Sequence, residues 1–202
     1  MVWVIAKLVP AGKKVVQNRT THGCNTQSQQ LPKNSIEQVK NFMKILVVSD
    51  THGYNTNLFK LLEQIKPIDM LIHCGDSGDL ADYIEEFVDC PVVMVRGNCD
   101  MCSPLKGEEV VDVCGHRIFV THGHAYGVKS GLGRLIDKAE SVGADIALYG
   151  HSHIPDLTYM RGISAFNPGS ISMPRQEGRR CTYGTIEISE DGKKAYCSLH
   201  TI

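Results

Sequence analysis

The sequence predicts an α/β domain in which two β-sheets pack face to face and helices cover their outer sides. From Met43 onward, short runs of apolar, β-forming residues alternate with segments of helical spacing. The helical segments concentrate in the first two thirds of this region and the strands in the last third. That distribution favours two packed sheets over one purely parallel, doubly wound sheet. A length of 202 residues suits a single domain with its own hydrophobic core.

The expected elements follow one another closely along the chain. A buried strand at 44–48 precedes a helix at 55–65, in which leucines recur at helical spacing and which ends before Pro67. The middle of the chain is expected to hold strands at 70–73 and 91–95, a helix at 81–88, and a hairpin of strands 110–113 and 117–121. The remainder is expected to hold a helix at 130–141 and strands at 146–149, 157–161, 163–167, 182–188 and 195–200.

The composition gives no general reason to expect a membrane or nucleic acid as a partner. Hydrophobic residues make up 42% and charged residues 21% of the chain, and the formal net charge is −1. No apolar run approaches the ~18 residues needed to span a bilayer, and the first residues lack the features of a secretory signal. The eight cysteines are scattered, which predicts reduced thiols in a cytoplasmic protein rather than a disulfide framework.

Residues 1–42 are predicted to be a poorly ordered, non-catalytic extension of the domain at 43–202. They hold six Lys or Arg and one acidic residue, Glu37, a formal charge of about +5 that leaves about −6 for the rest. Residues 17–34 are rich in Asn, Gln, Thr and Ser and lack apolar periodicity, which predicts poor order. The favoured interpretation is a tail upstream of a start at Met43, and the alternative is a basic arm that contacts a partner. Residues 1–16 also have strand-forming side chains that would suit an edge strand.

A cluster of metal-ligand residue types follows each of five predicted strands, and this is the most informative pattern in the sequence. The clusters are Asp50-Thr-His52-Gly, Gly75-Asp76, Gly97-Asn98-Cys99-Asp100, His122-Gly-His124 and Gly150-His151-Ser-His153. Loops at strand ends are where α/β folds place ligands, so the five clusters are expected to meet at one edge. A single Asp-x-His pair is weak evidence, but five clusters in this order exceed chance expectation by far.

The spacing and chemistry of these residues indicate a metal site. Residues two apart in an extended segment point the same way, so Asp50 with His52, and His151 with His153, can reach one centre or two neighbouring ones. Carboxylates, imidazoles and one amide together suit Mn, Fe, Zn or Ni better than Mg or soft metals. Asp76 has two carboxylate oxygens and can bridge two ions, which at ~3.5–4 Å clamp the oxygens of a phosphoryl displacement. The neighbouring glycines are expected to allow sharp turns and to leave room for the substrate.

These motifs resemble, in order, those of the calcineurin-like metallophosphoesterase superfamily over residues 43 to about 170. Within it the chain is similar to small phosphodiesterases of the YfcE type, which share the opening Met43-Lys-Ile-x-Val-x-Ser-Asp-Thr-His-Gly and a later Asn167-Pro-Gly-Ser170 run. The resemblance implies a four-layer α/β/β/α sandwich, the metallophosphoesterase fold. It also implies two divalent metal ions, manganese foremost. One ion would be held by Asp50, His52 and His153, the other by Asn98, His122 and His151, with Asp76 bridging both.

The resemblance further implies that a water or hydroxide activated by the metals attacks phosphorus directly, without a covalent enzyme intermediate. Asp76, Asn98, Cys99, Asp100 and His124 are the candidate catalytic positions. Asp100 is expected to orient a neighbouring ligand by a hydrogen bond, and His124 is either such a supporting or substrate-facing group or an ordinary histidine. Cys99 stands where many superfamily members have a histidine that assists the leaving group. A thiol is a poor donor and acid near neutral pH, which favours activated diesters over monoesters.

Three functions stay open on the sequence alone. The favoured one is a metal-dependent phosphodiesterase acting on a small phosphodiester, with nucleic acid only as a possible substrate. A phosphomonoesterase or protein phosphatase is chemically adjacent, but Cys99 and the small size of the chain count against it. A protein-interaction scaffold, like the retromer subunit that shares this fold, is disfavoured because all seven presumed ligands are present. A homodimer is expected only as the commonest oligomeric state.

Overall fold

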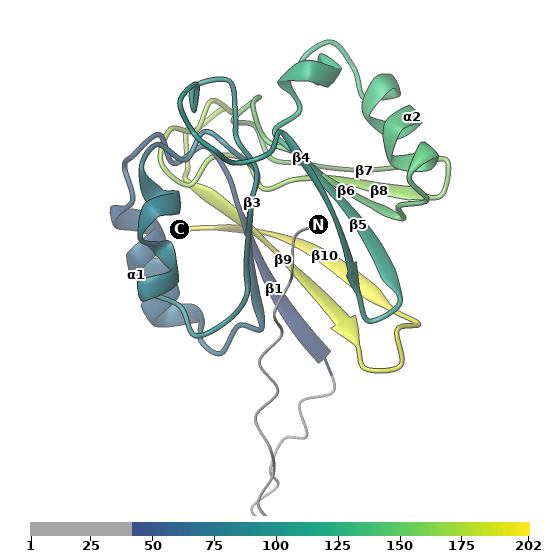
Figure 1. Ribbon diagram of the computed structural model, residues 1–202, viewed down its shortest axis with the longest axis horizontal. Coiled ribbons are helices and arrows are strands. Elements are labelled where there is room, and N and C mark those ends of the chain that lie inside the picture. Colours follow the sequence, from purple (N-terminus) through teal and green to yellow (C-terminus); the bar gives the residue numbers. More distant parts are fainter. Residues whose placement is uncertain (1–41) are drawn as a thin grey trace, which may run out of the picture. The chain divides into compact units, whose positions relative to one another are not determined.

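The computed structural model describes residues 42–202, so the predictions for the N-terminal extension lie outside the described residues. Two five-stranded sheets form the described domain (Figure 1). Sheet A has the strand order β10 (Ala195–Thr201), β9 (Thr182–Ser189), β1 (Phe42–Val48), β2 (Met70–His73) and β3 (Val92–Met94). Sheet B has the order β4 (Glu108–Val113), β5 (His116–Thr121), β6 (Ile146–Leu148), β8 (Ile163–Asn167) and β7 (Asp156–Met160).

Each sheet contains a group of three parallel strands. In sheet A, β1 pairs in parallel with β2, and β2 with β3. In sheet B, β6 pairs in parallel with both β5 and β8. The loops that follow β1, β2, β3, β5 and β6 carry the five predicted ligand clusters. Parallel strands bring their carboxyl ends to the same edge of a sheet, so each sheet gathers its own clusters.

Successive residues of a strand point to opposite faces of the sheet. The core therefore has one part between the two sheets and two parts on their outer faces. Ile45 and Val47 of β1 lie in the inner cluster with Ile118, Val120 and Phe166 of sheet B. The intervening residues of β1 pack instead against α1 (Thr56–Ile65) and the short helices η1 (Leu80–Asp82) and η2 (Ile84–Glu86). On the far side of sheet B, α2 (Gly133–Ser141) forms the third cluster. Figure 1 shows α1 and α2 on opposite outer sides, which confirms the α/β/β/α sandwich.

The predicted helix at 81–88 is wrong. This segment forms two separate 3₁₀ turns, η1 and η2, with Tyr83 between them at a φ of −142°. The Tyr83 hydroxyl accepts a hydrogen bond from Asn55 Nδ2 at 2.7 Å, and its ring packs near Phe59 and Phe87. These contacts hold the residue outside helical geometry, so tertiary structure overrides a moderate helical preference. The strands and the other two predicted helices are present, with ends shifted by up to a few residues.

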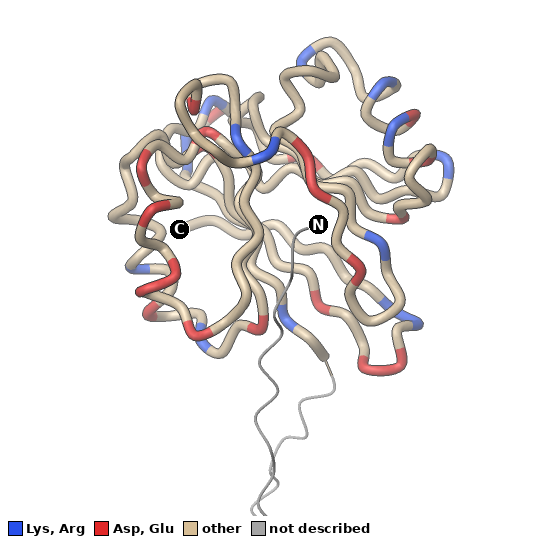
Figure 2. Tube along the Cα trace, viewed as in Figure 1, with Lys and Arg blue, Asp and Glu red and all other residues tan. Residues whose placement is uncertain are grey.

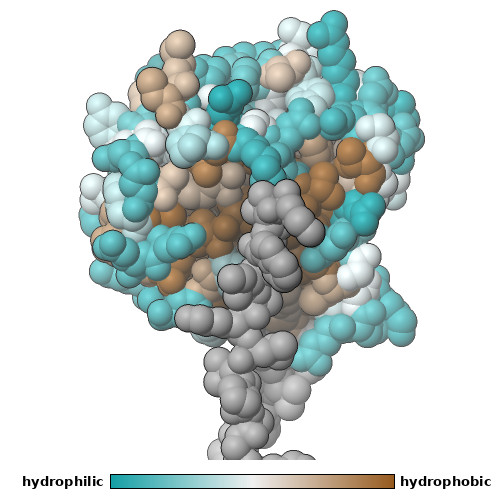
Figure 3. Space-filling model, in the orientation of Figure 1, coloured by the Kyte–Doolittle hydropathy of each residue, from teal (hydrophilic) through white to brown (hydrophobic). Residues whose placement is uncertain are grey.

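The described surface has one acid-rich and one apolar area. Figure 2 shows Asp and Glu positions gathering along the chain around α1, η1 and η2, which gives no electrostatic footprint for a polyanion on that side. Figure 3 shows hydrophobic residues on the face that carries β3 and β4. A groove of about 270 Å³ lies there, lined in part by Val92, Leu105 and Val111. Within residues 42–202, no helix has the length and apolar character to cross a membrane.

Candidate metal centre

Six of the seven predicted ligands come together where the loops after β1, β2, β5 and β6 meet. Asp50 and His52 follow β1, and Asp76 follows β2. On sheet B, His122 follows β5, and His151 and His153 follow β6. Both sheets therefore contribute ligands, which lie close in space although up to about a hundred residues separate them in the sequence.

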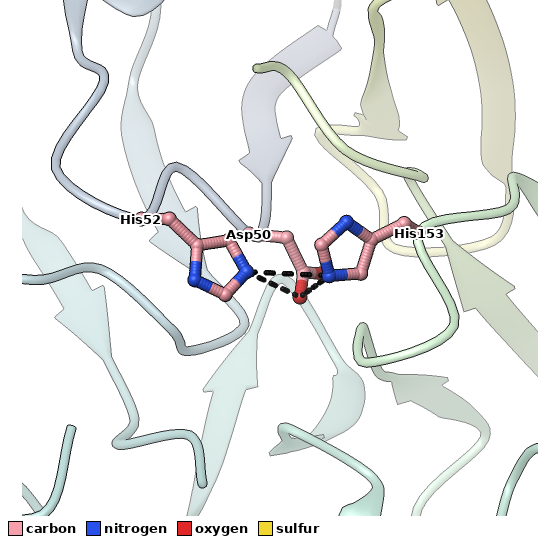
Figure 4. Close-up of side chains that lie close together, drawn as sticks. All are labelled: Asp50, His52 and His153. Carbon is pink, nitrogen blue, oxygen red and sulfur yellow. Dashed lines mark hydrogen bonds and ion pairs between the residues drawn. The ribbon is translucent and has the colours of Figure 1, made fainter. Parts of the chain in front are cut away.

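Asp50, His52 and His153 form the first group (Figure 4). The buried Asp50 Oδ1 lies 3.1 Å from His153 Nε2 and 3.8 Å from His52 Nε2. The two imidazole nitrogens are 3.2 Å apart and point toward each other and the carboxylate. Two nitrogen lone pairs and a carboxylate oxygen at these separations repel one another unless a proton or a cation lies among them. The group has the residue types and compactness of a divalent metal site.

Asp76, His122 and His151 form the second group, which adjoins the first. His122 Nε2 lies 3.3 Å from Asp76 Oδ2 and 4.0 Å from Asp50 Oδ1. The rings of His122 and His151 are 5.1 Å apart between centroids, and the backbone N–H of His151 donates to Asp50 Oδ2 at 3.1 Å. Asp76 Oδ2 is also 3.7 Å from His52 Nε2. Asp76 is thus close to both groups, and so is Asp50, which forms a further possible metal group with Asp76 and His122.

Hydrogen bonds to the far side of two histidines leave the nitrogens that face the centre free. His122 Nδ1 lies 2.8 Å from the carbonyl oxygen of Cys74, and His153 Nδ1 lies 2.6 Å from that of Met173. A carbonyl oxygen only accepts, so each Nδ1 carries the proton and each Nε2 presents its lone pair to the centre. Asp50 Oδ1 and His122 Nε2 are buried and have no well-directed hydrogen bond. Buried polar atoms without a partner are costly, and a bound cation would satisfy both, so these residues fit a metal.

The charges of the centre also suit a cation. Burial acts to raise the pKa of Asp76, but His122 and the Cys99 N–H outweigh it and hold that pKa well below its usual range. Burial also acts to raise the pKa of Asp50, but the neighbouring histidines outweigh it, so that pKa is lowered. Burial, followed by the charge of His122, lowers the pKa of His151 to about 4, so its imidazole is neutral near pH 7. Burial acts to lower the pKa of His122, but Asp76 and Asp50 outweigh it and raise that pKa, so a metal at His122 would replace a proton. Two charged carboxylates beside these imidazoles make a donor set for divalent ions.

Asn98 and Cys99 lie at the exposed side of the centre. The Cys99 N–H donates to Asp76 Oδ1 at 2.7 Å, which holds this turn against the Asp76 carboxylate. The described hydrogen bond of the Asn98 side chain goes from Nδ2 to Cys99 Sγ at 3.3 Å, not to another predicted ligand. The assignment of Asn98 to the second ion therefore stays a prediction. Burial and then Asp76 raise the pKa of the Cys99 thiol, which keeps it protonated.

Asp100 and His124 occupy supporting positions. The buried Asp100 carboxylate accepts backbone N–H bonds from Gly97 at 2.8 Å, Gly78 at 3.0 Å and Ser77 at 3.2 Å. It thereby ties the loop after β2 to the loop after β3 through the backbone, not through a ligand side chain. His124 begins the 3₁₀ turn η3 (His124–Tyr126), and its ring centroid is 5.5 Å from that of His122. Burial lowers the pKa of His124, with His122 as the next cause.

Most of the ligand positions have a strained backbone that the sequence does not reveal. Eight described non-glycine residues have positive φ, and five of them are predicted ligands: Asp50, His52, Asp76, His151 and His153, at φ between 48° and 67°. Such conformations are costly for residues with a side chain and gather at functional sites. The surrounding contacts must impose them here, because neither Asp nor His selects this geometry alone.

The expectation that the neighbouring glycines leave room for the substrate is wrong at two positions. A Cβ at Gly97 would lie 2.0 Å from Asp76 Oδ1, and one at Gly150 would lie 2.0 Å from Ser49 Oγ and 2.7 Å from Asp50 Oδ2. The space beside these glycines is filled by the carboxylates of the centre. Their role is to let the two ligand loops approach each other closely.

Three further residues hold the ligand loops in place and were not identified as site residues from the sequence. Ser49 donates to Asp50 Oδ2 at 2.7 Å, and Ser170 donates to the carbonyl oxygen of Asp50 at 2.8 Å. Asn167 donates to the carbonyl oxygen of Gly150 at 3.0 Å. Asn167 and Ser170 delimit the run that contributed to the family resemblance, and this was the available signal.

His73, expected in the core, is buried in β2, and burial lowers its pKa to about 4.

The geometry defines a class of protein: a sandwich of two sheets with a candidate Asp/His metal centre at their shared edge. Comparison with known proteins gives the same class. Residues 43–191 match the model of the calcineurin-like phosphoesterase superfamily domain, and the chain belongs to this family. The superfamily resemblance stated from the motifs is confirmed.

Similar proteins include bacterial phosphoesterases. A probable metallophosphoesterase of Bacillus subtilis, YsnB, is 36% identical over 150 residues, which cover 74% of this chain and 86% of that protein. The phosphodiesterase YfcE of Escherichia coli is 29% identical over 170 residues, which cover 72% and 88%. A solved structure of a predicted phosphoesterase from Streptococcus pneumoniae has a TM-score of 0.65 at 27% identity and covers 80% and 98%.

The fold also occurs in proteins that are not named as phosphoesterases. Vacuolar protein sorting 29 from Cryptosporidium parvum has a TM-score of 0.64 at 17% identity, over 80% of this chain and 98% of that one. At this identity the likeness concerns the fold alone. The fold does not decide between an enzyme and an interaction module, so the function has to be argued from the site.

Proposed function

We propose that this protein is a dinuclear, metal-dependent phosphodiesterase. The observation that carries the proposal is the pair of buried carboxylates, Asp50 and Asp76. Ring nitrogens of His52, His122 and His153 lie 3.1–3.7 Å from their oxygens, and the ring of His151 lies beside that of His122. Asp50, His52 and His153 would hold one ion, and His122, His151 and Asn98 the other, with Asp76 shared. Two divalent ions would supply the Lewis acidity that activates water and stabilises charge in an in-line displacement at phosphorus.

The chain's own residues fix the geometry of this chemistry. Ser49 and Ser170 orient the Asp50 loop, and Asp100 joins the loops after β2 and β3. Carbonyl acceptors keep His122 and His153 in the tautomer that directs Nε2 to the ions. The ring of His124 lies beside those of His122 and His151, from where it would contact a substrate phosphate.

The preference for diesters rests on Cys99. A monoester with a basic leaving group needs a good proton donor, and a thiol of raised pKa is a poor one near neutral pH. The leaving group of an activated diester departs without a proton donor. The E. coli relative named a phosphodiesterase supports the same choice. A small phosphodiester is the proposed substrate class, and scattered free thiols favour action in the cytoplasm.

The proposal is tested by hydrolysis of bis(p-nitrophenyl) phosphate and p-nitrophenyl phosphate with and without Mn²⁺, Fe²⁺, Zn²⁺ or Ni²⁺. We expect Mn²⁺ to stimulate hydrolysis of the diester above that of the monoester. Asp76→Asn should reduce the rate by at least ~100-fold, because the amide loses one of the two charged oxygens that bridge the ions. Asp137→Asn, at an exposed carboxylate paired with Arg161, is the matched control and should retain the rate. Equal rates for Asp76→Asn and wild type, or no hydrolysis with any of the metals, would refute the mechanism.

The same assay separates the alternatives. A phosphomonoesterase or protein phosphatase would hydrolyse the monoester or a phosphopeptide faster than the diester. An interaction scaffold would hydrolyse neither substrate although it binds the metal. Retention of all seven predicted ligands favours the enzyme, since a scaffold has no need of four histidines around two buried carboxylates.

A further inference from the structure

Cys99 lies beside two of the predicted metal ligands, His52 and Asp76. Its sulfur, a nitrogen of His52 and a carboxylate oxygen of Asp76 all lie within 4.8 Å of one another. The Cys99 N–H bonds to Asp76 Oδ1 at 2.7 Å, so the backbone of the cysteine is fixed against the bridging carboxylate. The thiol is exposed on its outer side, where it lines a cavity of about 440 Å³. On its inner side, the sulfur meets an imidazole and a carboxylate that come from two other loops.

Two buried atoms next to this triad indicate that the region is built to hold cations. Asp50 Oδ1 and His122 Nε2 belong to side chains with 0% exposure, and neither atom has a hydrogen-bond partner. Asp76 connects them to the triad, because its Oδ2 is 3.3 Å from His122 Nε2 and 3.7 Å from His52 Nε2. The sulfur of Cys99 therefore lies at the rim of a site whose buried interior has polar atoms that a cation would satisfy.

We propose that Cys99 is a thiolate ligand for thiophilic divalent cations such as Co²⁺, Zn²⁺ and Cd²⁺, which it binds together with His52 and Asp76. The inference rests on the metal-binding part of the proposed function and extends its donor set by one sulfur. On binding, the S–H bond breaks, its proton passes to solvent, and a sulfur–metal bond forms. Neither sulfur nor metal changes oxidation state.

The consequence is that one residue sets the metal preference of the centre. Mn²⁺ prefers oxygen and nitrogen donors and would leave the thiol protonated, whereas softer cations gain a thiolate ligand. A thiophilic ion held by sulfur at the exposed rim would also occupy space next to the bridging carboxylate where a substrate has to approach. Cys99 would then make the centre bind Mn²⁺ and thiophilic metals in two different ways.

The test is a Co²⁺ titration of the full-length, metal-free protein under reducing conditions, followed by absorption spectroscopy. The visible d–d bands of Co²⁺ report binding at the centre, and a sulfur-to-cobalt charge-transfer band in the near ultraviolet reports a thiolate ligand. We expect both signals in the wild type. Cys99→Ser and Cys99→Ala should retain the d–d bands and lose the charge-transfer band. Cys102→Ser is the matched control, because Cys102 is an exposed thiol lining the same cavity outside the triad, and it should retain both.

The possible results separate this inference from the proposed function. A wild type that shows d–d bands but no charge-transfer band, or a charge-transfer band that persists in both Cys99 variants, overturns the thiolate ligand and leaves the metal centre intact. Absence of any Co²⁺ signal in the wild type contradicts the metal centre itself, and the inference fails with it. Proton release on Cd²⁺ binding in weak buffer gives a second measurement, which should fall by about one proton per site in Cys99→Ser.

Discussion

At the scale of single residues, the centre combines donor atoms with a backbone held in unfavourable conformations. Five predicted ligands have φ between 48° and 67°, each at a cost of roughly 1–2 kcal/mol. Hydrogen bonds from Ser49, Ser170 and Asn167 to the ligand loops offset part of that cost. These bonds fix the positions of the ligand loops, as expected for a site in which donor geometry is set by the protein.

Gly150 offers a direct test of how closely the two ligand loops must approach. Gly150→Ala places a Cβ where Ser49 Oγ and Asp50 Oδ2 lie, at 2.0 and 2.7 Å, so Asp50 has to move. We expect unfolding free energy to fall by about 1–3 kcal/mol and Mn²⁺ affinity to fall with it. Denaturant unfolding and metal titration measure the two effects.

Gly133→Ala is the matched control for that substitution. Gly133 begins α2, and a Cβ there would meet nothing within 4 Å. This change should leave metal affinity unaltered and raise stability by about 0.4–1 kcal/mol, because alanine restricts the unfolded chain. An unchanged metal affinity in Gly150→Ala would show that the close approach of the loops is not needed for the site.

At the scale of elements, two hairpins of sheet B share one turn geometry. Val113 pairs with His116 across Cys114 and Gly115, and Met160 pairs with Ile163 across Arg161 and Gly162. Both residues of each turn have positive φ: 47° and 84° in the first, 52° and 83° in the second. Two-residue turns with two positive φ values favour Asn-Gly. The sequence has Gly at the second position of each turn and a disfavoured residue at the first.

Cys114→Asn should therefore stabilise the protein. Asparagine tolerates the left-handed region better than cysteine, and the expected gain is about 0.5–1 kcal/mol in the free energy of unfolding. The matched variant Arg161→Asn makes the same backbone change but removes the exposed ion pairs of Arg161 with Asp137 and Glu140, so its gain should be smaller. Thermal unfolding of both variants at one pH measures the difference. A loss of stability in Cys114→Asn would mean that its sulfur contact with Met43 matters more than the turn.

The elements also show how far the sequence alone could be interpreted. Strands such as β2 and β8 have the predicted bounds, because apolar runs between turn residues report burial on a sheet directly. The segment at 81–88 failed because the bond from Asn55 to Tyr83 is a tertiary contact with no local signal. For the site, the structure brings together six of the seven ligands that the motifs predicted. The left-handed backbone could not be predicted, since contacts between loops far apart in sequence impose it, such as the bond from Ser170 to the Asp50 carbonyl oxygen.

At the scale of the whole domain, the centre joins the two sheets. Asp50, His52 and Asp76 extend from sheet A, whereas His122, His151 and His153 extend from sheet B. Elsewhere the sheets are held together by the apolar cluster between them, which includes Ile45 and Phe166. At the ligand edge, two buried carboxylates lie among imidazoles, of which those of His122 and His153 are buried, and polar atoms are left unsatisfied. Metal ions at this edge would connect the sheets and remove that penalty.

Metal binding should accordingly stabilise the whole domain against unfolding. An ion that binds only the folded state adds about 2.7 kcal/mol at a free concentration one hundred times its Kd, or roughly 5–10 °C in Tm for a domain of this size. Differential scanning fluorimetry of the metal-free protein with increasing Mn²⁺ should show a saturable rise that EDTA reverses. Asp76→Asn should lose most of the rise, because its carboxylate lies between both groups of ligands, whereas Asp137→Asn should retain it. An equal rise in Asp76→Asn would place the stabilising ion elsewhere and separate the centre from the stability of the fold.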